Sequence, residues 1–123
     1  DGDCLSDMVL AMYGSIAGAE SVVLSLDENL RPKVAMAEAP HGTAPSLEGK
    51  NVANPMAMLL ACAALLDQAS LHLDDVQFHK AGGRLRAATL EGAADGIRTF
   101  DLGGISSTSE VVDDVITRLR VSL

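Results

Sequence analysis

The chain has 123 residues, the size of one ordinary domain, and is too short for two independent cores. Hydrophobic residues make up 48% of it and aromatic residues only 2%, so the core must be aliphatic, which favours packed helices over a β-sandwich. The formal net charge of −8 repels phosphate backbones and anionic headgroups, so we expect neither nucleic acid nor a membrane as a partner.

A helix is predicted from Asp3 to about Met12, because apolar residues recur at three- and four-residue spacing. Asp3 and Asp7 lie four residues apart, so both carboxylates project from one helical face and can share a Mg²⁺ or Mn²⁺ ion. The alternative is that two acids in a first turn only balance the helix dipole, and spacing alone favours this alternative.

Two strands are predicted next, from Ser21 to Glu28 and from Lys33 to Glu38, with the turn "NLRP" between them. A sheet this small does not stand alone, so we expect further strands to come from elsewhere. The chain also begins without Met. We interpret it as a piece of a longer polypeptide, with N-terminal processing as the alternative.

A polar stretch, "HGTAPSLEGKNVANP", interrupts the apolar chain from His41 to Pro55. Its small residues leave the backbone bare and its prolines stiffen it, a composition typical of loops that bind a phosphorylated ligand through main-chain N–H groups. It follows a strand and precedes a helix, as ligand loops in α/β folds do. Neither common nucleotide fingerprint is present, and an ordinary surface connection is the alternative, which the composition alone slightly favours.

Three further helices are predicted. The first begins at Pro55 with Asn54 as its cap, runs to about Leu71 and is apolar nearly all round, so we expect it to be buried on most sides. The second spans Leu73 to about Ala94, broken or loosened at Gly82-Gly83, and the third is capped by Thr108 or Ser109.

Isolated polar residues outside these stretches carry little functional signal. Cys4 and Cys62 have no CxxC spacing, so we expect small buried thiols of a reducing, cytoplasmic protein. His72 and His79 are expected at the surface or at an interface. Arg98 and Asp101 form a structural ion pair or border a ligand, and the structural role is favoured.

Four stretches together resemble a known family. "GDCLSD", "EAPHGTAP", "GKNVANP" and "IRTFDLGG…STSE" occur in the same order and with similar gaps as in the C-terminal part of the isocitrate and isopropylmalate dehydrogenases, the metal-dependent β-decarboxylating dehydrogenases. The resemblance covers essentially the whole chain. It departs from the family at Glu20, where Pro is usual, and at Ser46, where NAD-specific members commonly have Asp and NADP-specific ones Lys.

The resemblance implies a fold and a domain division. The fold is α/β, part of the isopropylmalate dehydrogenase-like fold, mostly helical with a small share of a larger mixed sheet. Residues 1–17 then hold a helix and hinge of the smaller, dimer-forming domain. Residues 18–123 form the C-terminal part of the large nucleotide-binding domain.

The resemblance also implies site residues. Asp3 and Asp7 match the aspartates that hold Mg²⁺ or Mn²⁺, completed by a carboxylate from the second protomer of a homodimer. The NAD or NADP site comprises a glutamate beside the nicotinamide ribose, the turn that receives the adenosine and its phosphates, the residue after that turn, and the asparagine that meets the adenine. These are Glu38, His41, Gly42, Thr43, Ala44, Pro45, Ser46 and Asn54.

The implied function is oxidative decarboxylation of a 2-hydroxy acid. Isocitrate is favoured over 3-isopropylmalate and tartrate- or malate-type substrates, because isopropylmalate enzymes more often have "HGSAP" where this chain has "HGTAP". The family's substrate-clamping arginines and its acid–base Lys and Tyr belong to earlier segments, so this chain alone is expected to be inactive and to hold no catalytic residue. Two alternatives stay open: a non-catalytic or truncated homologue with an assembly or regulatory role in a larger complex, and a stand-alone helical adaptor.

Overall fold

The computed structural model describes residues 5, 8, 9, 12 and 20–121, and the structural statements below concern these residues. Leu5, Met8, Val9 and Met12 are helical, as predicted, and exposed. The predicted metal ligands Asp3 and Asp7 and the hinge from Gly14 to Gly18 lie outside the described residues. The rest is an α/β arrangement dominated by helices, in agreement with the predicted fold class.

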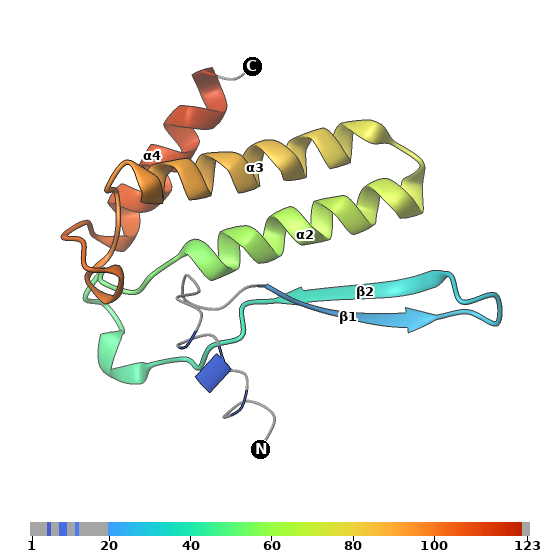
Figure 1. Ribbon diagram of the computed structural model, residues 1–123, viewed down its shortest axis with the longest axis horizontal. Helices are drawn as coiled ribbons and strands as arrows, with labels where there is room; N and C mark the ends of the chain where they lie inside the picture. The colour runs from blue at the N-terminus through green and yellow to red at the C-terminus, as the bar shows by residue number, and fades with distance from the viewer. Residues whose placement is uncertain (1–4, 6–7, 10–11, 13–19, 122–123) are drawn as a thin grey trace.

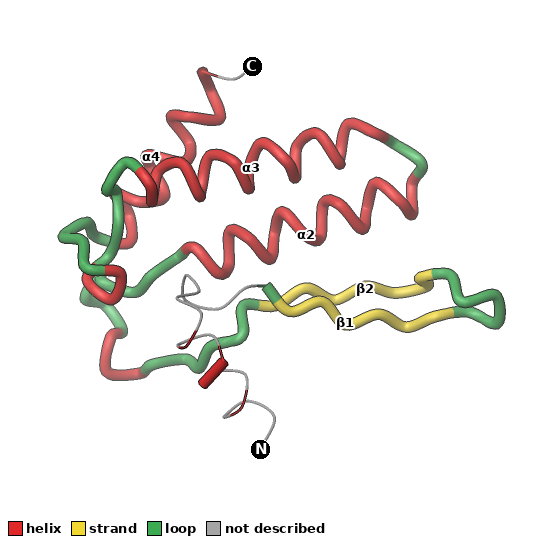
Figure 2. Tube along the Cα trace, in the orientation of Figure 1, coloured by secondary structure: helices red, strands yellow, loops and turns green. Residues whose placement is uncertain are grey.

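A two-stranded sheet and two antiparallel helices form three layers, seen edge-on in Figure 1. Strands β1 (Ser21–Leu26) and β2 (Pro32–Glu38) lie beneath α2 (Met56–Leu73), and α3 (Val76–Ala94) covers the other side of α2. Helix α4 (Thr108–Val121) packs against the end of α3. The loops that connect β2 with α2 and α3 with α4 meet at one end of the layers (Figure 2).

The strands pair antiparallel, with Val23 opposite Met36 and Val22 opposite Ala37. Small alanines on β2 approach α2, whereas Val23, Val34 and Met36 are half or more exposed. Among the described residues no element covers that second face of the sheet. Both predicted strands are therefore confirmed, and the expectation that further strands complete the sheet stays a prediction.

Helix α2 supplies most of the core. Ala57, Leu60 and several alanines are buried, and Met56 packs with Ala93 of α3 and Val111 of α4. Its length and hydropathy alone would allow a membrane span, but here it packs as a central helix. The prediction that it is buried on most sides is only partly correct, because two layers cover two of its faces and Met58 and Leu65 remain exposed. Cys62, predicted to be buried, is exposed for the same reason.

The predicted break at Gly82-Gly83 is wrong, because α3 runs through both residues without interruption. Gly82 is buried where α3 meets α2: a Cβ there would lie 2.8 Å from the carbonyl oxygen of Ala63. The glycine therefore permits close helix packing rather than a bend. A Cβ on Gly83 would meet no atom within 4 Å.

The helix termini differ slightly from the predicted ones. Asp74 is left-handed, and the side chain of Asp75 accepts a hydrogen bond from Gln77 N, so α3 begins at Val76 rather than Leu73. The cap of α4 is Ser107 rather than Thr108 or Ser109. Its Oγ accepts from the N–H of Glu110 at 3.3 Å, and its own N–H donates to the Glu110 carboxylate at 2.7 Å, which together make a capping box.

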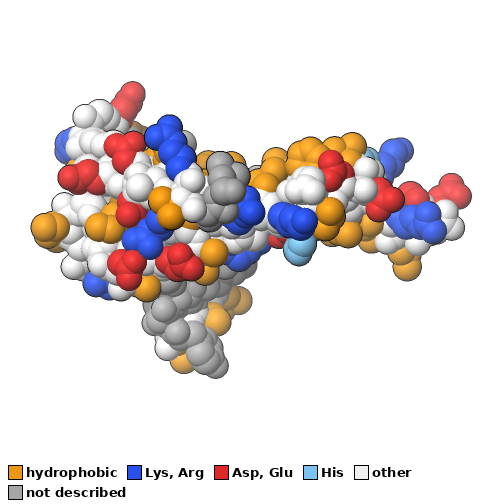
Figure 3. All heavy atoms as spheres, turned by 90° about the horizontal axis from the view of Figure 1, so that it is seen from above, with side chains coloured by type: hydrophobic (Ala, Val, Ile, Leu, Met, Phe, Trp, Pro, Cys, Tyr) orange, Lys and Arg blue, Asp and Glu red, His pale blue; other side chains and the backbone are white. Residues whose placement is uncertain are grey.

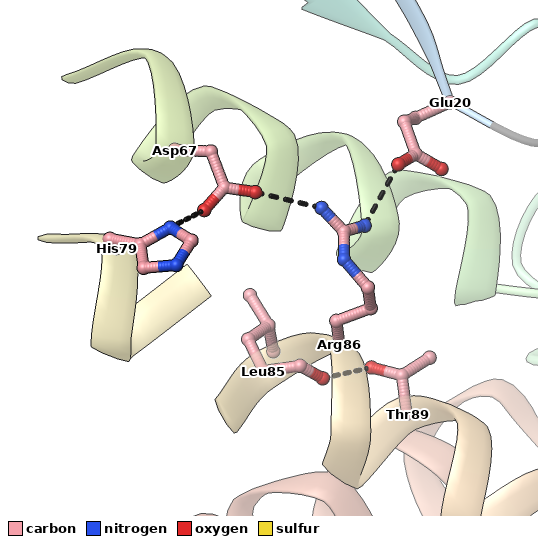
Figure 4. A network of polar contacts seen from close by, with 6 residues as sticks. All are labelled: Glu20, Asp67, His79, Leu85, Arg86 and Thr89. Carbon is pink, nitrogen blue, oxygen red and sulfur yellow. Dashed lines mark hydrogen bonds and ion pairs between the residues drawn. The ribbon is translucent and has the colours of Figure 1, made fainter. Parts of the chain in front are cut away.

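A polar network joins three elements (Figure 4). Arg86 on α3 donates to Glu20, just before β1, at 2.8 Å and to Asp67 on α2 at 2.9 Å. His79 lies 2.9 Å from the other oxygen of Asp67. Glu20, which replaces the family's usual proline, thus anchors the start of β1 to the helical layers.

Candidate functional site

An open cleft of about 1300 Å³ lies along the loop between β2 and α2. This exceeds the roughly 300–1,000 Å³ of pockets for drug-sized ligands, so an extended molecule has room in it. The loop forms one wall, and the segment after α3 contributes to the other. The described lining residues are Pro40, His41, Gly42, Thr43, Ala44, Pro45, Leu47, Glu48, Val52, Ala53, Asn54, Ala57, Phe100 and Asp101.

The loop wall presents free backbone donors. Within the described residues, the N–H groups of Gly42, Thr43 and Ala44 make no hydrogen bond to the protein. The next residues turn away, because the N–H groups of Leu47 and Glu48 close the 3₁₀ turn η1 (Pro45–Leu47). Successive unpaired N–H groups bind oxyanions such as phosphate.

Ala44 holds this loop in an unusual shape. Its φ of 41° and ψ of 63° are left-handed, a region that costs an L-residue roughly 1–2 kcal/mol. Pro45 then fixes the first position of η1. The strain lies within the cleft wall itself, where backbone strain commonly accompanies ligand binding.

His41 is exposed at the cleft, and its ring contacts the backbone of Gly42. Its Nδ1 lies 3.1 Å from the carbonyl oxygen of Gly42, which can only accept, so Nδ1 carries the proton in this contact. In the neutral ring Nε2 is then left as an acceptor.

Another part of the lining brings together residues far apart in sequence. The Nδ2 of Asn54 donates to Oδ2 of Asp101 at 2.9 Å, and its Oδ1 accepts from Met56 N at 2.9 Å. Asp101 lies in the 3₁₀ turn η2 (Phe100–Leu102), and its Oδ1 accepts from the hydroxyl of Thr99, which is 1% exposed. The ring of Phe100, 86% exposed, borders the same cleft.

Helix α4 fixes the second half of the loop. The side chain of Asn51 donates to Ser109 Oγ at 2.8 Å and accepts from Ser109 N at 3.1 Å. Thr108 donates its N–H to the carbonyl of Asn51 and its hydroxyl to the carbonyl of Ala53. These bonds hold the approach to Asn54 in place.

The cleft carries no Lys or Arg among its described lining residues, whereas Glu48 and Asp101 are acidic. Across the face shown in Figure 3, acidic and basic side chains are interspersed rather than gathered into a basic patch. Nearby, the hydrogen bonds from Ser107 lower the pKa of Glu110, so this carboxyl stays ionised at the start of α4.

The structure brings most of the predicted cofactor residues to one place. His41, Gly42, Thr43, Ala44 and Pro45 line the cleft, and so does Asn54. Glu38 at the end of β2 and Ser46 within η1 lie outside the described lining. Arg98 does not pair with Asp101. Instead Asp101 faces Asn54, which sequence reasoning missed because 47 residues separate the two.

No group of three His, Cys, Asp or Glu side chains suited to a metal ion occurs among residues 20–121 and the four described residues before them. The predicted ligands Asp3 and Asp7 are not among those residues. The metal site therefore remains a prediction of the sequence.

Comparison with known proteins gives the same class as the motifs. The model of the isocitrate/isopropylmalate dehydrogenase family matches residues 1–115, so the chain belongs to this family. The chain is 40% identical to 3-isopropylmalate dehydrogenase of Novosphingobium aromaticivorans, over 96% of this chain and 32% of that protein.

Other relatives carry different activities in their names. The chain is 34% identical to a probable tartrate dehydrogenase/decarboxylase of Bacillus subtilis, over 97% of this chain and 31% of that protein. It is 37% identical to a mitochondrial regulatory subunit of isocitrate dehydrogenase (NAD) from Dictyostelium discoideum, over 99% of this chain and 31% of that protein. The chain thus spans about a third of the length of these relatives.

Proposed function

We propose that the chain forms the C-terminal part of an NAD(P)- and Mg²⁺- or Mn²⁺-dependent oxidative decarboxylase of a 2-hydroxy acid. The observation that carries this proposal is the row of unpaired N–H groups at Gly42, Thr43 and Ala44, in a cleft that Asn54 also lines. Family membership supports the same class of reaction, because two of the relatives named above are named as dehydrogenases of hydroxy acids.

In this proposal, the residues of this chain bind and orient the dinucleotide and the divalent cation. The three N–H groups hold the diphosphate, and the amide of Asn54 meets the adenine. Glu38 lies toward the nicotinamide ribose, and Asp3 and Asp7 hold the divalent cation. When bound, the dinucleotide supplies the hydride acceptor and the cation a Lewis acid that favours loss of CO₂.

The charge of the cleft favours NAD over NADP. The extra phosphate of NADP needs a basic partner, and none of the described lining residues is Lys or Arg. Glu48 and Asp101 add negative charge to the same wall. Ser46 offers the phosphate only a hydroxyl.

The substrate follows less directly from these residues. We propose isocitrate, on the basis of Thr43 in "HGTAP", with 3-isopropylmalate and tartrate- or malate-type acids as the competitors. Rates of NADH formation by the full-length protein with each acid rank them. A higher kcat/KM for any competitor overturns this choice without affecting the cofactor site.

The function is tested by calorimetry and turnover on the full-length protein with NAD, NADP and Mn²⁺. We expect NAD to bind more tightly than NADP, and Mn²⁺ to be required for decarboxylation. Asp7→Ala should abolish metal-dependent turnover while the fold is retained, whereas Asp113→Ala, the same change on an exposed face of α4, should not. Turnover that survives Asp7→Ala would refute the metal assignment.

A regulatory role is the second candidate, favoured by the similarity to a relative so named and by Ser46. In that case the full-length protein binds a nucleotide but decarboxylates no 2-hydroxy acid on its own. Mixing it with a catalytic partner would then change the partner's rate.

A further inference from the structure

We propose that Asp101 is a positioning residue of the dinucleotide site, which sets the direction in which the amide of Asn54 faces adenine. This inference rests on the proposed function, because it assigns a ligand to Asn54. Asp101 itself need not touch the dinucleotide. Its effect passes through the 2.9 Å hydrogen bond to Nδ2 of Asn54.

The two contacts of Asn54 permit only one orientation of its amide. A carboxylate such as Asp101 can only accept, so the nitrogen must face it, and Met56 N–H can only donate, so the oxygen must face the helix. A flipped amide would place its oxygen against the Asp101 carboxylate and its NH₂ against the N–H of Met56. Both bonds would be replaced by repulsion.

The orientation of the Asn54 amide decides which ligand groups the cleft can recognise. Asn54 has a second N–H on Nδ2 that Asp101 does not use, and an unused lone pair on Oδ1. Together these form a donor–acceptor pair of fixed sense. Adenine carries an adjacent donor and acceptor on its base edges, so a fixed pair recognises it at a lower entropic cost than a freely flipping amide.

The side chain of Asp101 is itself fixed by neighbouring residues. The hydroxyl of buried Thr99 donates to its other carboxylate oxygen. The turn that carries both residues closes through the bond from Ser106 N to Arg98 O, 2.9 Å long. A side chain at Gly104 would overlap the carbonyl of Arg98, so the glycine keeps this turn closed. A small, rigid turn thus presents the carboxylate to a residue 47 positions away.

The test compares Asp101→Ala, Asp101→Asn, Asn54→Ala and the double variant Asp101→Ala/Asn54→Ala in the full-length protein. Calorimetry measures binding of NAD, of ADP-ribose and of nicotinamide mononucleotide, which lacks the adenosine half. Asp113→Ala serves as the matched control, because it removes an exposed carboxylate outside the cleft. Thermal unfolding of each variant is measured alongside.

We expect Asp101→Ala to raise the dissociation constants of NAD and ADP-ribose about five- to tenfold, the worth of one net hydrogen bond, and to leave nicotinamide mononucleotide unchanged. Asp101→Asn should largely restore affinity, because its amide oxygen can still accept from Asn54 while its NH₂ faces the Thr99 hydroxyl. In the Asn54→Ala background, Asp101→Ala should have no further effect on affinity.

Four results would overturn the proposal. Equal loss of nicotinamide mononucleotide binding would mean that Asp101 only maintains the fold. Additive losses in the double variant would mean that it acts independently of Asn54. If wild type and Asp101→Ala bind ADP-ribose with equal affinity, the positioning role alone is refuted. If wild type binds no dinucleotide, the proposed function is refuted as well.

Discussion

Replacing Gly82 by alanine tests whether the layers are as closely packed as the structure shows. The new Cβ would lie 2.8 Å from the carbonyl oxygen of Ala63, 3.1 Å from Oδ1 of Asp67 and 3.3 Å from Cβ of Leu66. The backbone oxygen cannot yield unless α2 moves, and overpacking of this kind costs about 1–3 kcal/mol. The higher helix propensity of alanine offsets about 1 kcal/mol of this cost, so the net decrease in the free energy of unfolding is at most about 2 kcal/mol.

Gly83→Ala is the matched control. Its Cβ meets no atom within 4 Å, so only the propensity gain of about 1 kcal/mol remains and the variant should be more stable than wild type. Propensity cancels between the two variants, so the measured difference is the cost of the contact itself, about 1–3 kcal/mol. Urea unfolding followed by circular dichroism measures it. Equal stabilities for the two variants would refute the close approach of α2 and α3.

Other predictions follow from local contacts. Because hydrogen bonds from Ser107 depress the pKa of folded Glu110 below 4.5, its contribution to stability is full above that pH and is lost as the pH falls through the folded value. The stability difference between wild type and Glu110→Gln should therefore shrink in acid, and a difference that grows in acid would contradict this. Arg86→Met should lower the free energy of unfolding by about 1 kcal/mol and exposed Arg84→Met should not, in thermal melts. Ala44→Gly should raise the free energy of unfolding by up to about 1 kcal/mol, because glycine adopts the left-handed conformation without the strain of alanine. A loss of stability would contradict the strain at that position.

The elements with a strong local signal were predictable from the sequence. Two short runs of strand-forming residues on either side of the "NLRP" turn predicted β1 and β2, apolar periodicity predicted α4, and Asn54-Pro55 marked the start of α2 to within one residue. The cap of α4 was missed by one or two positions, because Ser107, Thr108 and Ser109 are all competent caps. Only the bond to Glu110 selects Ser107.

Features set by distant contacts were not predictable. A glycine pair inside a helical pattern indicates a break unless a second helix packs closely against it. The sequence around Gly82 carries no signal that α2 lies there. In the same way, Asp101 pairs with Asn54, 47 residues away in the sequence, rather than with nearby Arg98. The resemblance located the loop from His41 to Pro45, whereas only the folded chain shows which side chain orients Asn54.

The central claim is that the cleft between the loop from His41 to Ala53 and the turn from Thr99 to Gly104 binds a dinucleotide. A crystal structure of the full-length protein grown with NAD and Mn²⁺ tests it most directly. We expect the diphosphate to lie within hydrogen-bond distance of the N–H groups of Gly42, Thr43 and Ala44, with adenine against Asn54. A dinucleotide bound elsewhere, with this cleft filled by other parts of the protein, would contradict the account.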